Sequence, residues 1–406
     1  MNKNLPLSNI VVLDLTNVLS GPFATQILSD LGAEIIKVEK PDGDDSRKFG
    51  PFINKRSSYF ISLNRGKKSI IIDFKKEEDR KLFKKLLAVS DVIIDNFRPG
   101  VLERYGFSSS FLKKKFPSLI QTKISGFGET GPLKENPAYD MIVQAMGGIM
   151  SITGKNKKET YRVGSSIGDI AAGLYAVIGV LTQIIFRNKS KKGSRLDLSM
   201  LDCQVAILEN AIARYSVEKK IPFPLGTDHP SITPFGTFKT LDGTLAIAVG
   251  NNKTFKDFCY SLNNEKLYKK KKYENNAKRN KNLSDLRKDI EFEMKKKKTD
   301  YWCKVFIKNK IPHSKINNVK DVIKNKQVQN RKMILDAMKE LKRSGKIEVR
   351  PIDIIKHLGA TSNSKEGKRI SRTIQRMASN YEITSVVGKY GLYKLNSEED
   401  INHNHY

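Results

Sequence analysis

The chain has 406 residues, enough for two or three domains, and its 39% hydrophobic and 29% charged content excludes collagen-like and fully disordered proteins. Its formal net charge of +31 favours polyanionic ligands, including nucleotide-bearing cofactors. Runs such as Lys269–Lys272 and Lys295–Lys298 are also typical of solvated helix faces, so the charge by itself does not define a nucleic-acid site. The apolar stretch Ile170–Phe186 contains Thr182 and Gln183 and is shorter than a membrane span, so it predicts a buried helix.

The cysteines and the first residues bear on the compartment. Cys203, Cys259 and Cys303 are scattered and odd in number, which indicates neither a metal spacing nor a disulfide framework. No charged and then apolar leader precedes the strand-like run Asn9–Asp14, so no secretory signal is expected. We therefore predict a cytoplasmic protein without a metal site or membrane association.

Strand and helix patterns alternate through the first 125 residues. Helices are predicted at Phe23–Leu31, which Gly21-Pro22 opens, and at Lys76–Val89, which has one apolar stripe. The spacing implies parallel strands and a Rossmann-like α/β layer. Runs rich in β-branched residues predict strands at Asn9–Leu15, Glu34–Glu39, Ser69–Asp73, Asp91–Asp95 and Leu119–Ile124.

The turn after the first predicted strand reads Leu19-Ser20-Gly21-Pro22, not Gly-x-Gly-x-x-Gly. Hydride transfer with a dinucleotide therefore loses its main support. A P-loop, His-Glu-x-x-His and Gly-x-Ser-x-Gly are also absent from the sequence.

Later segments predict a helical layer and a smaller second domain. Long helices are expected at Ile170–Phe186 and Leu201–Val217, short strands at Ile232–Val249, and mainly Lys-rich helices from Thr254 to Asn325. The predicted domains are a large α/β domain over 1–220, a small α+β domain over 221–334 and an atypical tail over 335–406.

Short motifs in a collinear order carry a family resemblance. Together they resemble the class III coenzyme A transferases (CaiB/BaiF type) over about residues 5–334. Within that family, Gly226-Thr227-Asp228-His229 and Gly250-Asn251-Asn252 are most similar to dicarboxylate-using members, and the lack of a polyglycine run argues against a formyl or oxalate specialist. The motifs are Val12-Leu13-Asp14-Leu15-Thr16, Asp30-Leu31-Gly32-Ala33-Glu34, Lys37-Val38-Glu39-Lys40-Pro41, Leu63-Asn64-Arg65-Gly66-Lys67-Lys68-Ser69, Asp95-Asn96-Phe97-Arg98-Pro99-Gly100, Gly126-Phe127-Gly128, Ala138-Tyr139-Asp140, Gly168-Asp169, Phe238-Lys239-Thr240 and Ile316-Asn317-Asn318-Val319.

The resemblance places a nucleophilic carboxylate on Asp169 and a supporting carboxylate on Asp140. Moving CoA between two acids needs such a nucleophile, which forms a mixed anhydride and then an enzyme-bound CoA thioester. Asp169 begins an apolar helix after Gly168, where backbone N–H groups can stabilise an oxyanion. Each aspartate also fits a plain helix N-cap, and that alternative stays open.

The resemblance further implies CoA as a substrate carrier, no tightly bound cofactor and a homodimer. CoA carries phosphates and an adenine, so Lys or Arg and a hydrophobic slot are expected. Pro137 stands where some relatives have a basic residue. The CoA-binding positions implied by the motifs are Leu19, Ser20, Lys40, Ile72, Lys75, Asn96, Phe97, Arg98, Arg104 and Tyr139.

Two other classes of protein remain. An α-methylacyl-CoA racemase of the same fold would need a His–Asp pair, but Tyr139 stands where that family carries histidine. A regulatory chimera is suggested by the tail, where helices to about Ser344, at Ile352–Leu358 and at Lys365–Ser379 precede a hairpin within Tyr381–Leu395. This order suggests a winged helix that could bind nucleic acid through the tail, with a merely solvated basic helix as the alternative.

Overall fold

The computed structural model describes residues 5–329 and, beyond them, 348–349, 364, 368, 384–385 and 393–394. The described residues divide into two compact units: those within 1–149, 162–213 and 326–406 form one, and residues 150–161 and 214–325 form the other. The predicted domain limits stay predictions. The helices predicted for the tail lie outside the described residues.

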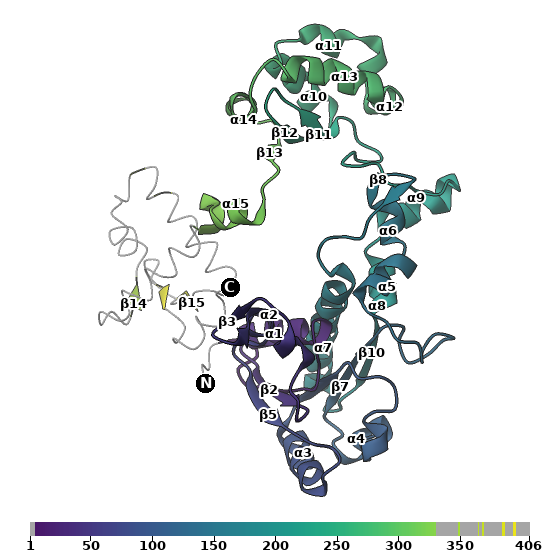
Figure 1. The fold of residues 1–406 in the computed structure, drawn as a ribbon, viewed down its shortest axis with the longest axis vertical. Coiled ribbons are helices and arrows are strands. Elements are labelled where there is room, and N and C mark those ends of the chain that lie inside the picture. The colour runs from purple at the N-terminus through teal and green to yellow at the C-terminus, as the bar shows by residue number, and fades with distance from the viewer. Residues whose placement is uncertain are drawn as a thin grey trace. The chain divides into compact units, whose positions relative to one another are not determined.

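The larger unit contains a six-stranded sheet with the order β10-β7-β6-β1-β2-β5 (Figure 1). Every neighbouring pair is parallel, which confirms the predicted α/β architecture. The edge strand β10 was not predicted, because its Arg-Leu-Asp-Leu-Ser sequence mixes charged and apolar residues and lies at a half-covered edge. The strands are β1 (Val11–Asp14), β2 (Glu34–Glu39), β5 (Lys68–Ile71), β6 (Val92–Asp95), β7 (Ile120–Ser125) and β10 (Arg195–Ser199).

Apolar residues on successive strand positions divide between two cores. Val12 and Ile94 belong to the core that includes α1 (Ser20–Asp30) and α7 (Ile167–Ser190). Leu13 and Ile93 belong to the other core, with α3 (Glu77–Val89) and α4 (Ser109–Lys115). Since side chains alternate along a strand, these helices cover opposite faces of the sheet.

Helix α7 was predicted to be buried, but only one of its faces is. That face includes Ala172, Ala176 and Val180, and packs against α1 (Figure 1). Ile178 and Ile185 on the other face are largely exposed in the single chain. Among the described residues, α7 alone is long and apolar enough to cross a membrane, and 39% of its most apolar window is buried.

The predicted helix Leu201–Val217 and the apolar run after Asp140 are each divided into two helices in the structure. The run Leu201–Val217 forms α8 (Met200–Ala206) and α9 (Asn210–Glu218), separated by a turn in which Glu209 has a φ of 33°. The apolar run after Asp140 forms α5 (Asp140–Met146) and α6 (Ile149–Ile152). Gly148 lies between them with a φ of 84°, which a glycine adopts without steric cost. Hydrophobic periodicity continues across both breaks and therefore did not reveal them.

The smaller unit has its own antiparallel sheet and helical core. Strands β11 (Phe235–Lys239), β12 (Thr244–Ala248) and β13 (His313–Lys315) form the sheet in that order. Phe255, Phe258, Trp302 and Phe306 are buried in this core. Its helices are α10 (Asn252–Ser261), α11 (Glu265–Lys269), α12 (Asn276–Lys281), α13 (Leu283–Met294) and α14 (Thr299–Lys308).

Shorter elements complete the described residues. They are the 3₁₀ turns η1 (Asp45–Lys48), η2 (Glu103–Tyr105) and η3 (Lys271–Tyr273), the hairpin β3 (Phe52–Ile53) and β4 (Arg56–Ser57), α2 (Ser58–Asn64), the hairpin β8 (Gly154–Asn156) and β9 (Glu159–Thr160), α15 (Val319–Ile323), and β14 (Glu348–Val349), β15 (Thr384–Ser385) and β16 (Tyr393–Lys394), which pair in the order β14-β16-β15.

Candidate active site

The predicted CoA-binding residues all follow the carboxyl ends of strands in the parallel sheet. In a parallel sheet these carboxyl ends all lie at the same end of the strands, so the fold gathers the segments there. This is the usual place for ligands in open α/β sheets. Helix α7 connects the parallel strands β7 and β10, so its N-terminus also lies at this edge. The residues are Leu19 and Ser20 after β1, Lys40 after β2, Ile72 and Lys75 after β5, Asn96, Phe97, Arg98 and Arg104 after β6, and Tyr139 after β7.

Asp169 lies in the first turn of α7, against the beginning of α1. The hydroxyl and the backbone N–H of Ser20 lie close enough to its carboxylate to lower its pKa. Gly173, one turn further along α7, makes this approach possible, because a Cβ atom there would stand 2.8 Å from the carbonyl oxygen of Ser20. The N-terminal ends of two helices therefore meet at this carboxylate, and both favour negative charge.

Asp140, the first residue of α5, is held by two buried hydrogen bonds. Its Oδ1 accepts from the backbone N–H of Gly168 at 2.8 Å, and its Oδ2 accepts from Nε2 of Gln144 at 2.7 Å. The bond to Gly168 connects Asp140 to the residue immediately before Asp169. The structure thus brings together the two carboxylates that the sequence selected.

Asp169 has an altered acidity. Burial, and then the charge of Asp140, raise the pKa of Asp169 to about 6, although the bonds from Ser20 act in the opposite direction. A carboxylate with this pKa is ionised at neutral pH and is more basic than an ordinary aspartate, as a nucleophile requires.

Neither Asp169 nor Asp140 is a helix N-cap, which was the alternative to an active-site role. The N-cap of α7 is Ser166 and that of α5 is Tyr139, and Asp169 and Asp140 lie inside the helices. Asp140 instead bonds the Gly168 N–H of the other helix. Both carboxylates are therefore oriented by tertiary contacts.

Tyr59 is a residue that sequence reasoning did not select but whose acidity the two carboxylates affect. Burial and then the charges of Asp169, Asp44 and Asp140 raise the pKa of its phenol. It belongs to the short helix α2, whose beginning is capped by Ser57. No local motif in the sequence marked this tyrosine.

The loop between β1 and α1 is clamped from the neighbouring strands. The side chain of Asn96 accepts from the Asn17 N–H at 2.8 Å and donates to the Asn17 carbonyl at 2.9 Å. Lys37 donates to the Thr16 carbonyl at 2.7 Å. The Val18 N–H donates to Asp44 at 3.2 Å, and Val18 has a φ of 67°, which is unusual for a β-branched residue. These contacts fix the backbone that leads to Ser20.

Buried ion pairs support the same loop. Lys67 contacts Asp14 at 3.1 Å, and both side chains are at most 1% exposed. Lys37 and Asp44 form a second buried pair at 2.9 Å. Burial lowers the pKa of Lys67 to about 8 even though the Asp14 charge opposes that shift.

The predicted CoA-binding residues differ in their surroundings. Ile72 is 1% exposed and its side chain belongs to the core, so only its backbone is available to a ligand. Lys75, Arg98 and Arg104 are exposed, and Tyr139 is 75% exposed. Lys40 is exposed and forms an ion pair with Asp45 at 2.6 Å. The residues of this set that are partly or fully buried are Leu19, Ser20, Asn96 and Phe97.

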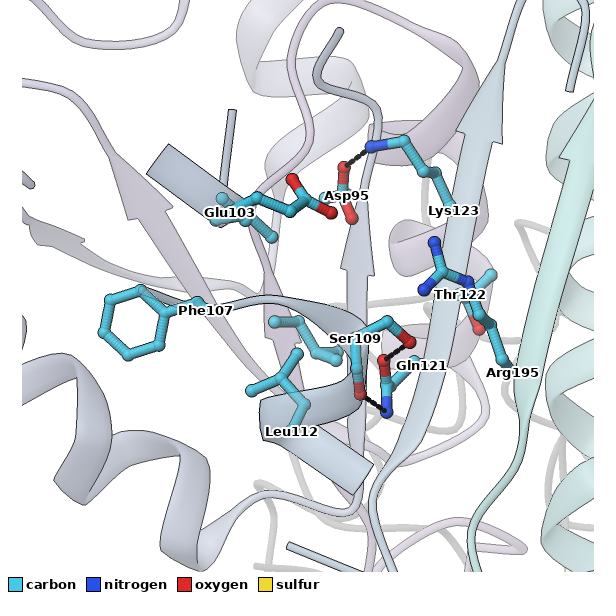
Figure 2. A pocket seen from close by; sticks show the side chains of 11 residues that line it. Asp95, Glu103, Phe107, Ser109, Leu112, Gln121, Thr122, Lys123 and Arg195 are labelled. Carbon is cyan, nitrogen blue, oxygen red and sulfur yellow. Dashed lines mark hydrogen bonds and ion pairs between the residues drawn. The ribbon is translucent and has the colours of Figure 1, made fainter. Parts of the chain in front are cut away.

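A small polar cavity of about 30 Å³ lies beneath the turn after β6 (Figure 2). Asp95 and Lys123 point toward each other across it and bond at 2.7 Å. Asp95 also accepts from the Phe97 N–H at 3.1 Å. The cavity has room for about two waters and is too small for CoA.

The motifs that favoured a dicarboxylate user lie in the smaller unit. Asn251 caps α10, and Asn252 accepts from the buried guanidinium of Arg279 at 2.9 Å. Asp228 pairs with Arg287. These side chains stabilise the smaller unit itself.

Comparisons with known proteins agree with this architecture. A model of CoA-transferase family III matches residues 7–354, which extends past residue 334, where the sequence resemblance was drawn to end. The human succinyl-CoA:glutarate CoA-transferase is 38% identical over 86% of this chain and 80% of its own length. The acetyl-CoA:oxalate CoA-transferase of Acetobacter aceti is 38% identical over 82% of this chain and 86% of its own length.

The crystal structure of a CaiB/BaiF family protein from Brucella suis superposes with a TM-score of 0.74 at 38% identity, covering 82% of this chain and 89% of that one. Fold, site and comparisons thus define an α/β enzyme that transfers coenzyme A. The chain belongs to CoA-transferase family III.

Proposed function

We propose that the protein moves CoA from an acyl-CoA donor to a small dicarboxylic acid, with Asp169 as the nucleophile. The observation that carries this proposal is the Asp169 carboxylate at the beginning of α7, next to Gly168, which Asp140 holds, with its pKa raised to about 6 by burial and by the charge of Asp140. The dicarboxylate class is supported by the names of the relatives, which include glutarate and oxalate enzymes. One of these relatives uses oxalate, so the relatives do not support the argument that the lack of a polyglycine run excludes an oxalate enzyme.

The reaction needs four acyl-substitution steps, each of which forms or breaks a bond to the Asp169 carboxyl group. Asp169 attacks the donor thioester carbonyl and expels CoA thiolate, which leaves a mixed anhydride. The thiolate attacks the aspartyl carbonyl, releases the donor acid and leaves an aspartyl-CoA thioester. The acceptor carboxylate attacks that thioester to form a new anhydride and free thiolate. The thiolate finally attacks the acceptor carbonyl, which gives acceptor-CoA and regenerates Asp169.

The residues around Asp169 suit these steps. The hydroxyl and N–H of Ser20 lower the pKa of Asp169, so these donors favour its charge each time Asp169 is released as a carboxylate. Asp140 opposes ionisation and keeps the nucleophile basic. The exposed Lys75, Arg98 and Arg104 at the same sheet edge supply positive charge for the CoA phosphates.

A racemase would need a histidine beside the acidic residue, and Tyr139 occupies that position. A mass-spectrometric panel separates the two enzymes. Wild type mixed with succinyl-CoA should gain a CoA adduct on the peptide that contains Asp169 and should form new thioesters with glutarate or oxalate. Asp169→Ala should form neither. Full transfer by Asp169→Ala, or deuterium uptake at the α-carbon of a 2-methylacyl-CoA, would overturn the proposal.

We also propose a homodimer that covers the outer face of α7. Leu174, Ile178, Ile185 and Phe186 are 45–61% exposed on one helix, an apolar surface that a single soluble chain rarely leaves open. Ile178→Glu should convert a dimer to monomer in light scattering. A wild-type monomer at micromolar concentration would contradict this.

Two further proposals concern the location and the tail. We keep the cytoplasmic location as a proposal, with fractionation as its test. For the tail we propose a winged helix, supported by the strand order β14-β16-β15, in which the last strand lies between the other two. If it binds duplex DNA, the affinity of the full chain should fall steeply with salt, and replacing Arg369, Arg372 and Arg376 by Glu should remove it.

A further inference from the structure

We infer that Gln144 is a positioning residue that sets the geometry of Asp140 and Asp169. The inference rests on the proposed role of Asp169 as the nucleophile. Gln144 lies on α5, one turn after Asp140, and is fully buried. It does not reach the reacting atoms in this structure, but it joins the two segments that carry the carboxylates.

Each end of the Gln144 amide has a specific partner. Nε2 donates to Asp140 Oδ2 at 2.7 Å and to the Ser165 carbonyl at 3.4 Å. Oε1 accepts from the Val163 N–H at 2.8 Å. A backbone N–H can only donate, whereas a carboxylate and a carbonyl can only accept. The partners therefore fix the orientation of the amide, and the reversed orientation would oppose like groups at every contact.

The same network ties down the segment that leads into Asp169. Gln144 holds Val163 and Ser165, and Asp140 holds the Gly168 N–H at 2.8 Å. Gly168 is closely packed as well, since a Cβ there would lie 3.1 Å from Asp140 Oδ1 and 3.2 Å from Val143 Cγ1. Two backbone groups before α7 and one in its first turn thus depend on α5, and one amide side chain makes two of those three contacts.

The chemical role of Gln144 follows from its two-sided hydrogen bonding. Glutamate has nearly the same shape but offers an acceptor where Asp140 needs a donor, so Gln144→Glu opposes two carboxyl groups in a buried site. Either Asp140 moves or a proton is shared, and in both cases the field at Asp169 changes. Misplacing a reacting group by about 1 Å can cost on the order of 100-fold in rate. We expect Gln144→Glu to slow adduct formation by roughly 10- to 100-fold.

The chain supplies a matched control on α8. Gln204 is also a fully buried glutamine, and a Cβ on Gly168 would lie 3.5 Å from its Oε1. Neither end of its amide has a hydrogen-bond partner among the described residues. Gln204→Met and Gln144→Met therefore make the same chemical change, but only the second removes defined contacts.

The test is a single-turnover experiment with succinyl-CoA, followed by intact mass. The amplitude counts the enzyme molecules able to form the aspartyl-CoA adduct, and the rate constant reports their geometry. Gln144→Glu and Gln144→Met should retain the amplitude and lose rate, with Met the milder change. Gln204→Met should match wild type in both quantities.

The outcomes separate the inference from the proposed function. A Gln144 variant with lower amplitude but an unchanged rate constant would show a purely structural role and overturn the inference, as would equal rates for Gln144→Met and Gln204→Met when both are slow. Wild type that transfers CoA without forming an adduct would overturn the nucleophile assignment, and the positioning role would fall with it. Thermal melting of each variant measures the folded fraction independently.

Discussion

Lowering the pH should switch off Asp169 well above the range in which an ordinary aspartate protonates. With a pKa of about 6, raised by burial and by Asp140, Asp169 is ionised to about 90% at pH 7 and about 10% at pH 5. With the unperturbed value of 3.8 it would still be about 94% ionised at pH 5. The structure therefore predicts roughly a tenfold loss of reactivity between pH 7 and pH 5.

The assay is the second-order rate constant for adduct formation under limiting succinyl-CoA, which reports ionisations of the free enzyme and free substrate. Phosphate monoesters titrate near pH 6, so the 3′-phosphate of CoA must be controlled for. A dephospho-CoA thioester removes that group and should leave the acid limb in place. A rate constant that stays flat down to pH 5 would refute the assigned pKa and with it the coupling of Asp169 to Asp140.

The raised pKa also has a cost in stability. The folded state holds this proton more tightly than the unfolded state, so the Asp169 contribution to stability falls as pH rises from about 4 to 6. The shift from 3.8 to about 6 corresponds to at most about 3 kcal/mol. Asp169→Asn should therefore raise the free energy of unfolding at pH 7 while abolishing the adduct. An Asn variant less stable than wild type at pH 7 would contradict this reasoning.

Three further substitutions test the support of the loop before α1. Lys67→Met leaves Asp14 as a buried charge without its ion-pair partner and should lower the free energy of unfolding in urea by about 3–5 kcal/mol; a change under about 1 kcal/mol would show that the pair is dispensable. Asn96→Ala removes both hydrogen bonds to Asn17 and should lower the free energy of unfolding in urea by about 1–3 kcal/mol. The affinity for CoA, measured by calorimetry, should change little. A large loss of affinity without destabilisation would indicate that Asn96 contacts CoA directly. Val18→Asn places a residue that tolerates positive φ at 67° and should raise the melting temperature through about 1 kcal/mol of relieved strain, while an unchanged or lower melting temperature would place the strain elsewhere.

Local sequence patterns were sufficient for much of the sheet. Glu34–Glu39 is predicted with the same bounds that the structure shows, because strand residues buried on both faces form short β-branched runs. The resemblance to the class III coenzyme A transferases, carried by the ordered motifs, assigned roles to Asp169 and Asp140, whereas the local sequence of each fitted a helix N-cap equally well. The edge strand Arg195–Ser199 escaped prediction because partial cover removes the need for an apolar run.

What the sequence by itself determined is the α/β class, the family resemblance and the carboxylates that we propose as reacting groups. Tertiary structure alone decided how they are arranged: Ser20 meets Asp169 because Gly173 lets two helices approach, and Gln144 meets Val163 because α5 packs beside the beginning of α7. The charges of Asp169 and Asp140 also raise the pKa of Tyr59, which lies on a helix that no motif marks. Tertiary structure also buries the Ile72 side chain in the core. It pairs both the oxygen and the nitrogen of the Asn96 side-chain amide with the Asn17 backbone. Such contacts join residues far apart in the chain, and packing and hydrogen-bond satisfaction select them, so no local periodicity records them.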